Sequence, residues 1–327
     1  MNADEYIASR AKLIEEAVLA EIPGEPEEVY GMLREFVARG GKRIRPVLTL
    51  ASCSACGGDE GKAMPFAVAV ELFHNFTLIH DDIEDSSPMR RGKPTLHMQY
   101  GIPMALNAGD ALYNIMWSSL FRKVGPEELH GGAPIMLRAF RMVAEGQGME
   151  LSWYRDKKFD VSEEDYLRMV EGKTAALIGA SCELGACAAD AEEGERGALR
   201  EFGEKTGLAF QIRDDVLNLT ADPSKYRKKI GEDVEEGKRS LIVIHLLSNS
   251  PEKVGRRVAG ILGKARKGAE EVGEVIALAK EYGSVEYASE YAERLVREAK
   301  RSLRAMGNAG GREMMEALGD YIVEREK

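Results

Sequence analysis

FTLIHDDIED, residues 76–85, closes an apolar run that begins at Phe66 and is rich in Val, Leu, Phe and Ile. Only Glu71, Asp81 and Asp82 carry a formal charge between residues 66 and 83. Such a run predicts a helix that is buried on most sides, because polar residues are too few to form a solvent face. We therefore expect its acidic end to lie in a cleft.

Two carboxylates of this stretch are predicted to share one helix face. Asp81 and Asp85 are four residues apart, with Thr77 one turn deeper and Phe76 beside it. Like charges repel at this spacing, so the pair suits either a solvated surface or a site where a hard cation bridges the carboxylates. The apolar approach favours the cation.

A second acidic group, FQIRDDVLN at residues 210–218, repeats the arrangement. Asp214 and Asp215 follow an apolar helical turn, and Asn218 places an oxygen four residues after Asp214. One acidic cluster is usually a solvated charge run. Two clusters at the ends of apolar helices indicate two walls of one metal-filled pocket.

The charge of the chain limits its partners. Its 327 residues are 44% hydrophobic, enough for a sizeable core, and the formal net charge is -10. An acidic chain is unlike proteins that bind nucleic acid, whose surfaces are basic. Basic residues nevertheless gather in three loops that suit a polyanionic ligand: Lys42, Arg43 and Arg45; Arg90, Arg91 and Lys93; and Arg227, Lys228, Lys229, Lys238 and Arg239.

The compartment is predicted to be the cytoplasm. The first ten residues lack the apolar core of a signal peptide, and no apolar stretch reaches the ~18 residues of a membrane span. Four cysteines are few for this length, which fits a reducing compartment. The pair Cys53 and Cys56 has the spacing of half a zinc site or a redox pair, but small buried thiols are the simpler interpretation.

The whole chain is predicted to be all-α, with residues 1–327 in one domain. Amphipathic segments are separated by glycine and proline, and the apolar run 241–247 has no strand to pair with, so we expect a helix there. Two places are expected to break the helical pattern. Residues 86–94 hold two prolines and a glycine and are predicted to lack regular structure, and residues 171–174 read Glu-Gly-Lys-Thr.

The acidic groups indicate magnesium chemistry on a diphosphate. Mg²⁺ uses few protein ligands and bridges substrate phosphate oxygens, while lysine and arginine match the remaining oxygens. Such a site can direct water to phosphorus, or can stabilise diphosphate as it leaves carbon and a carbocation forms. A deep wall of Phe73, Phe76 and Thr77 favours the second, since it excludes water and suits a hydrocarbon tail.

Five motifs resemble those of the trans-isoprenyl diphosphate synthases, in the family's order between Gly41 and Lys238. They are Gly41-Lys42-Arg43 with Arg45-Pro46, His80 to Asp85 followed by Arg90 to Thr95, Gly172-Lys173-Thr174, Phe210-Gln211 before Asp214-Asp215, and Lys229 to Asp233 before Gly237-Lys238. The resemblance implies an antiparallel helical bundle of the isoprenoid synthase type, with a central active-site cavity and usually a homodimer. It implies head-to-tail condensation of isopentenyl diphosphate with an allylic diphosphate.

The resemblance also implies roles for single residues. Asp81 and Asp85 would bind two Mg²⁺ ions and Asp214 a third, with Asp82 in the first motif, and with Asp215 and Asp233 supporting through water. The allylic diphosphate would be held by Arg90, Lys173, Gln211, Lys229 and Lys238, and the homoallylic one by Lys42, Arg45, His74 and Arg91. Thr174 and Gln211 would lie near the cation, and the departing diphosphate could take the proton.

Departures from the family pattern are few. Asn218 stands where many members have aspartate, and Glu150 likewise, so neither is counted as a metal ligand. Small Thr77 with aromatic Phe76 before the aspartates resembles the archaeal-type geranylgeranyl enzymes, which implies a twenty-carbon product, with farnesyl release as the alternative.

Two rival functions stay open. A terpene cyclase or head-to-head condensing enzyme shares the aspartates but lacks loops for a second diphosphate, and this chain keeps Lys42, Arg43, Arg90 and Arg91. A non-catalytic partner subunit usually loses an acidic motif, and both are present here.

Overall fold

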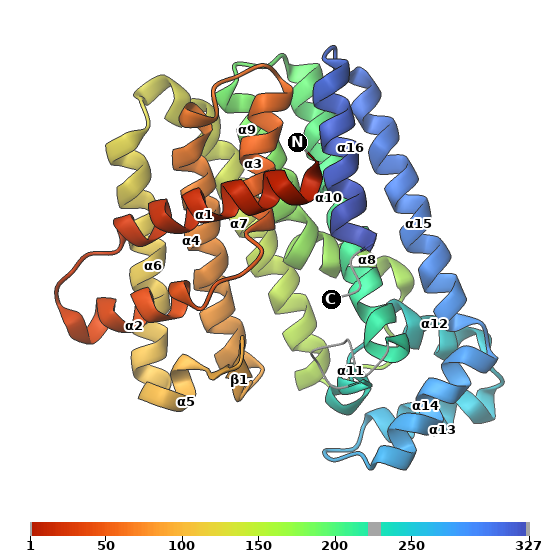
Figure 1. The fold of residues 1–327 in the computed structure, drawn as a ribbon. Coiled ribbons are helices and arrows are strands. Elements are labelled where there is room, and N and C mark those ends of the chain that lie inside the picture. The colour runs from red at the N-terminus through yellow and green to blue at the C-terminus, as the bar shows by residue number, and fades with distance from the viewer. Residues whose placement is uncertain (1, 222–229, 325–327) are drawn as a thin grey trace. The chain divides into compact units, whose positions relative to one another are not determined.

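The part of the chain that the structure describes is helical apart from one small hairpin, which agrees with the predicted all-α class. A computed structural model describes residues 2–221 and 230–324 (Figure 1). Their helices are α1 (Ala3–Glu21), α2 (Glu27–Ala38), α3 (Ile44–Ala55), α4 (Glu60–Glu84), α5 (Leu96–Tyr100), α6 (Ile102–Lys123), α7 (Pro126–Arg155), α8 (Glu163–Val170), α9 (Ala176–Ala188), α10 (Glu193–Thr220), α11 (Glu232–Glu236), α12 (Leu241–Asn249), α13 (Glu252–Leu262), α14 (Ala269–Glu281), α15 (Ser284–Ser302) and α16 (Ala309–Glu324), with a π-helical turn at Glu171–Ala175 and a 3-10 turn at Leu303–Ala305. No helix among them is both long and apolar enough to cross a membrane.

The described chain divides into two compact units. Unit 1 comprises residues 1–136, 180–200 and 305–318, and unit 2 comprises residues 137–179, 201–304 and 319–327. The expectation of one domain over residues 1–327 stays a prediction. We describe each unit by itself.

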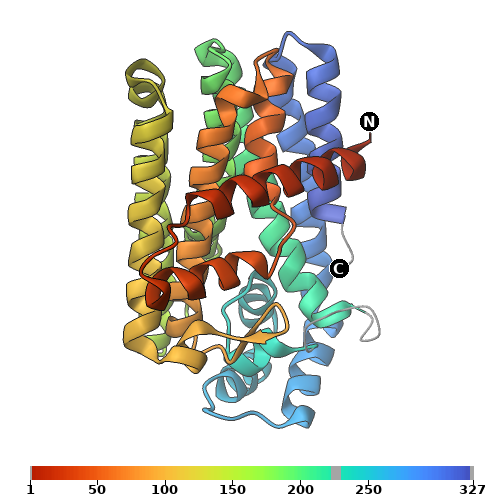
Figure 2. The ribbon, with the colours of Figure 1, turned by 60° about the vertical axis from the view of Figure 1, so that its left-hand side comes forward.

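Unit 1 is built around α4. This helix packs against α3 and α6, and α1 lies across α3 and α4 (Figures 1 and 2). Asp59 begins α4 by accepting a hydrogen bond from the amide of Gly61. Pro65 lies inside the helix, in its second turn, where it cannot donate to the carbonyl oxygen of Gly61. Phe66, Leu72 and Ile79 are each at most 1% exposed, which confirms the predicted burial of this helix on most sides.

Unit 2 has α12 at its centre. This helix contacts α8, α13, α14 and α15, and its apolar residues 241–244 and 246 are buried. The predicted helix over residues 241–247 is therefore confirmed. Ser162 caps α8 by accepting a hydrogen bond from the amide of Asp165 at 3.0 Å. Three acidic residues follow in the first turn, where their negative charges interact favourably with the positive end of the helix dipole.

The two predicted breaks take a different form in the structure. Met89–Arg90 and Lys93–Pro94 are two-residue strands that pair antiparallel, so the prediction that residues 86–94 lack regular structure was wrong. Residues 171–175 do not end the helix but form a π-helical turn between α8 and α9. A Cβ atom on Gly172 would lie 2.6 Å from the carbonyl oxygen of Met142, so this glycine allows close backbone packing.

Candidate active site

The first acidic group lies at the carboxyl end of α4. Asp85 is the last residue of the helical turn, and its amide donates to the carbonyl oxygen of Asp81 at 2.8 Å. Asp81 is half-buried and Asp85 is exposed, whereas Asp82 is only 1% exposed. The helix therefore presents two carboxylates outward and one inward.

Asp82 is held by the hairpin that follows α4. Arg90, on β1 (Met89–Arg90), places its Nε 2.6 Å from Oδ1 of Asp82, while Oδ2 is buried and accepts no hydrogen bond. Burial raises the pKa of Asp82, and the positive charge of Arg90 opposes that rise. A buried carboxylate oxygen without a donor is costly, so a cation or a donor at this position would be stabilised.

Predicted diphosphate-binding residues also lie together in unit 1, around the loop before α3 and the first turn of that helix. Nη1 of Arg45 lies 3.4 Å from Nε2 of His74 on α4, and the guanidinium of Arg91 lies against Gly41, where an added Cβ would be 2.8 Å from Nη2. Burial and then the charges of Arg45 and Arg91 lower the pKa of His74 well below its ordinary value. His74 is thus neutral within a cationic group that also includes the exposed Lys42.

The second acidic group lies on α10 in unit 2. Asp214 is half-buried and Asp215 is 7% exposed. Asp215 accepts hydrogen bonds on both oxygens, from the hydroxyl of Tyr166 at 2.8 Å and from Nε2 of Gln211 at 3.0 Å. Burial and the nearby Asp233 raise the pKa of Asp215 to about 7. Donors from the protein therefore already occupy both carboxylate oxygens of Asp215.

The π-helical turn presents two further predicted residues. Nζ of Lys173 donates to Glu150 at 2.6 Å, and the hydroxyl of Thr174 donates to Oε1 of Gln211 at 3.2 Å. A Cβ on Gly146 of α7 would lie 2.4 Å from the amide nitrogen of Lys173. The backbone of α7 at Gly146 therefore packs directly against the backbone of the π-helical turn at Lys173.

The loop after α10 carries Lys238. Its ammonium donates to Asp233 at 2.7 Å and lies 3.0 Å from Glu236. Burial opposes this charge, but Asp233 and Glu236 outweigh it and raise the pKa of Lys238. Lys229, also predicted to bind diphosphate, lies outside the described residues.

Comparison with known proteins places this geometry in one family. The polyprenyl synthetase family matches residues 26–279. The chain belongs to the polyprenyl synthetase family. It is 41% identical to the short chain isoprenyl diphosphate synthase of Methanocaldococcus jannaschii, over 91% of this chain and 90% of the relative.

Solved structures agree with the assignment to the polyprenyl synthetase family. The geranylgeranyl pyrophosphate synthetase of Pyrococcus horikoshii OT3 has a TM-score of 0.93 and 39% identity, covering 98% of this chain and 99% of that one. The polyprenyl synthase of Caulobacter crescentus CB15, complexed with calcium and isoprenyl diphosphate, has a TM-score of 0.88 and 27% identity, covering 99% and 98%.

The residues that are predicted to meet the hydrocarbon tail also lie together on α4. The ring of Phe76 lies 5.5 Å from that of Phe73, 4.6 Å from that of His80 and 5.4 Å from that of Tyr113 on α6. The hydroxyl of Thr77 donates to the carbonyl oxygen of His74 at 2.8 Å. The polyprenyl synthetase chain thus has an aromatic wall between α4 and α6 beside a small, internally satisfied threonine.

Sequence reasoning missed several residues that support the site. Tyr166 had no signal in the sequence, because a tyrosine on a short helix is most often packing alone. Asn218, which the sequence does not identify as a metal ligand, accepts the amide of Asp233 on its Oδ1 at 3.1 Å, so it holds the start of α11 just before Lys238. Glu71 did have a signal, since it is the one charge deep in an apolar run.

The described residues contain no cluster of side chains that could bind a metal ion without help from a substrate. No three or more His, Cys, Asp or Glu side chains cluster closely enough there. A Mg²⁺ ion held by one or two carboxylates and by substrate phosphates needs no such cluster. Burial raises the pKa of Cys53 to about 11 and that of Cys56 to about 12, which agrees with the interpretation of these cysteines as unreactive packing residues.

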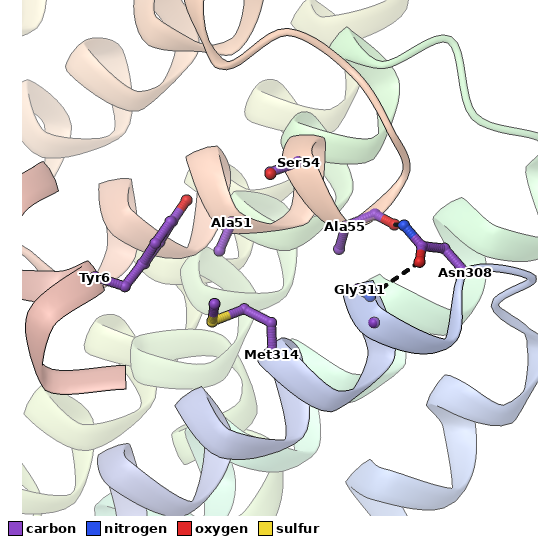
Figure 3. A pocket seen from close by; sticks show the side chains of 8 residues that line it. Tyr6, Ala51, Ser54, Ala55, Asn308, Gly311 and Met314 are labelled. Atoms are coloured by element: carbon purple, nitrogen blue, oxygen red, sulfur yellow. Dashed lines mark hydrogen bonds between the residues drawn. The ribbon is translucent and has the colours of Figure 1, made fainter. Parts of the chain in front are cut away.

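A surface cavity of about 310 Å³ also lies in unit 1, between α1, α3 and the start of α16 (Figure 3). The side chain of Asn308 closes one end, donating to the carbonyl oxygen of Ala55 at 2.9 Å and accepting the amide of Gly311 at 3.1 Å. The lining residues are Tyr6, Ala51, Ser54, Ala55, Asn308, Gly310, Gly311 and Met314. None of the predicted site residues is among them.

Proposed function

We propose that this protein condenses isopentenyl diphosphate head-to-tail with allylic diphosphates and releases geranylgeranyl diphosphate. One observation carries the proposal: unit 1 holds Arg90 against the acidic end of α4, and it also holds two further cations, Arg45 beside His74 and Arg91 against Gly41. An enzyme with a single diphosphate substrate would need only the first. The similarity to the Pyrococcus geranylgeranyl pyrophosphate synthetase supports the same conclusion.

The metal in this proposal is Mg²⁺, with three ions per active site. Carboxylate oxygens at the end of α4 and on α10 are the donors that this hard cation prefers, and the buried, unsatisfied Oδ2 of Asp82 fits a nearby positive charge. When bound, Mg²⁺ neutralises the charge that develops on diphosphate as its bond to carbon breaks. Asp81, Asp85 and Asp214 would hold the ions.

The protein's own residues then position the two substrates. Arg90, Lys173, Gln211, Lys229 and Lys238 would bind the allylic diphosphate, and Lys42, Arg45, His74 and Arg91 the homoallylic one. Neutral His74 can give a hydrogen bond to a phosphate oxygen without adding charge to the surrounding arginines. The hydroxyl of Thr174 and the amide oxygen of Gln211 would direct dipoles at the cation, and no side-chain base is required, because the departing diphosphate takes the proton.

Purified protein incubated with Mg²⁺, labelled isopentenyl diphosphate and one allylic starter at a time tests the proposal. We expect linear geranylgeranyl diphosphate from dimethylallyl, geranyl and farnesyl starters. A farnesyl end product, alone or as a stable mixture, would indicate a farnesyl or bifunctional enzyme. Cyclic or head-to-head products, or product only when another synthase is added, would support a cyclase or a non-catalytic partner subunit instead.

Product length is expected to depend on the aromatic wall. Replacing Phe76 by alanine removes the ring that meets the growing tail and should move the main product beyond twenty carbons. Thr77→Phe adds bulk one residue nearer the aspartates and should stop elongation at farnesyl. Chromatography of the dephosphorylated products measures both, and an unchanged chain length in both variants would remove the assignment of these two residues.

Assembly and location complete the proposal. We infer a homodimer, supported by exposed apolar side chains along α6, where Ile102, Leu106 and Phe121 are 52%, 40% and 69% exposed. Light scattering coupled to gel filtration distinguishes this from a monomer. A cytoplasmic location rests on the low cysteine content.

A further inference from the structure

Arg43 lies in sequence between two residues of the proposed homoallylic site, but its side chain is held by acceptors on other helices. It is 3% exposed, whereas Lys42 is exposed and Arg45 reaches His74. Its Nη1 donates to Glu71 at 2.5 Å, and its Nη2 donates to Glu15 at 3.0 Å and to the carbonyl oxygen of Val37 at 2.7 Å. Arg43 therefore joins the loop to α1, α2 and α4 and is not available to a phosphate.

Glu71 is a buried carboxylate that accepts a hydrogen bond from Arg43. It is 1% exposed, and its Oε1 also accepts Nδ2 of Asn75 at 2.9 Å. Removing one partner of such a buried pair leaves the other charge unpaired, which destabilises the contact between the loop and α4. Glu71 precedes His74 by three residues, so successive turns of α4 hold Arg43 and contact Arg45.

The backbone of the loop requires an anchor of this kind. Gly40, Gly41 and Arg43 have φ values of 82°, 147° and 50°, and the left-handed conformation is unfavourable for arginine. The carbonyl oxygen of Arg43 accepts the amide of Val47 and so begins α3. A strained residue persists only where its surroundings hold it, and here the side-chain contacts of Arg43 do so.

We propose that the Arg43–Glu71 pair is a positioning device that fixes Lys42 and Arg45 for the homoallylic diphosphate. The inference rests on the proposed function. Without the pair, isopentenyl diphosphate must order the loop when it binds, in addition to forming its phosphate contacts. The free-energy cost of this ordering weakens the binding of that substrate alone. The allylic diphosphate, held by other residues, should be affected far less.

The test compares Michaelis constants for the two substrates in Arg43→Met and Glu71→Gln. We expect the KM for isopentenyl diphosphate to rise about ten-fold in each, and the KM for geranyl diphosphate to stay within about two-fold. Arg43→Lys, which keeps a cation facing Glu71, should recover most of the loss. Equal rises in both constants, or no rise in either, would overturn the proposal.

A matched control separates positioning from general destabilisation. Arg10 on α1 also pairs with a glutamate of α4, since its Nε lies 2.7 Å from Oε2 of Glu60, at the opposite end of that helix from the acidic group. Arg10→Met should lower the melting temperature without changing the ratio of the two constants. A changed ratio in Arg10→Met would count against a specific role for Arg43.

Calorimetric titration with isopentenyl diphosphate alone keeps the two proposals apart. Weaker binding in Arg43→Met than in wild type would support the positioning role even if the wild-type protein formed no longer prenyl chain. Product formation by wild type with equal binding in both proteins would sustain the proposed function and overturn the inference.

Discussion

Replacing Asp81 by alanine should lower kcat for prenyl transfer by roughly 10³-fold, because one of the oxygen ligands that stabilise the departing diphosphate is lost. The fold should be retained. Asp81 is half-buried at the end of α4 beside two other carboxylates, so removing its charge relieves repulsion within the acidic group. Single-turnover kinetics with geranyl diphosphate measures the change, and thermal unfolding measures the stability.

Glu84 provides the matched control for this variant. It lies in the same helical turn and is exposed, and it is not among the proposed ligands. Glu84→Ala should therefore keep kcat within about three-fold of wild type, as expected for a surface substitution. Equal losses in both variants would mean that overall negative charge matters and that the position of Asp81 does not.

Gly146→Ala is expected to disable the second half of the site through the backbone. The added Cβ would lie 2.4 Å from the amide nitrogen of Lys173 and 2.7 Å from the carbonyl oxygen of Met169, and backbone atoms cannot rotate away. We expect about 2–3 kcal/mol of destabilisation. Displacement of the π-helical turn should also lower kcat by roughly 10²-fold, since small misplacements of substrate-binding groups have effects of that size.

Gly148, two residues further along α7, isolates the packing effect. It is exposed, and a Cβ there would meet nothing within 4 Å. Gly148→Ala should stabilise the helix by about 0.5–1 kcal/mol and leave kcat unchanged. Thermal unfolding and steady-state kinetics measure both variants. Equal stability of Gly146→Ala and Gly148→Ala would contradict close backbone packing of α7 against the π-helical turn.

Much of the fold followed from patterns that act locally. The apolar run before Asp81 has too few polar residues for a solvent-exposed face, which predicts a buried helix. The apolar run over residues 241–247 has no strand to pair with, which predicts a second helix. The acidic ends of α4 and α10 were recognisable for the same reason, since a helix fixes which side chains share a face. The proposed ligands were thus accessible from the sequence.

Features that depend on contacts between distant segments were not accessible. The π-helical turn exists because Gly146 and Gly172 let two backbones approach, and the sequence around Lys173 suggested only a break. The hydrogen bond from Tyr166 to Asp215 joins residues 49 positions apart. In the sequence Arg43 is one more cation of its loop, whereas in the structure its three acceptors lie on α1, α2 and α4.

The account depends most on carboxylates that bind diphosphate through magnesium. Calorimetric titration of inorganic pyrophosphate into the wild-type protein and Asp81→Ala, with Mg²⁺ and with EDTA, tests this directly once the heat of Mg²⁺ binding to pyrophosphate is subtracted. We predict that Mg²⁺ tightens binding to wild type by about 10²-fold or more and that most of this gain is lost in Asp81→Ala. Equal affinity with and without Mg²⁺, or a full gain in the variant, would contradict the account.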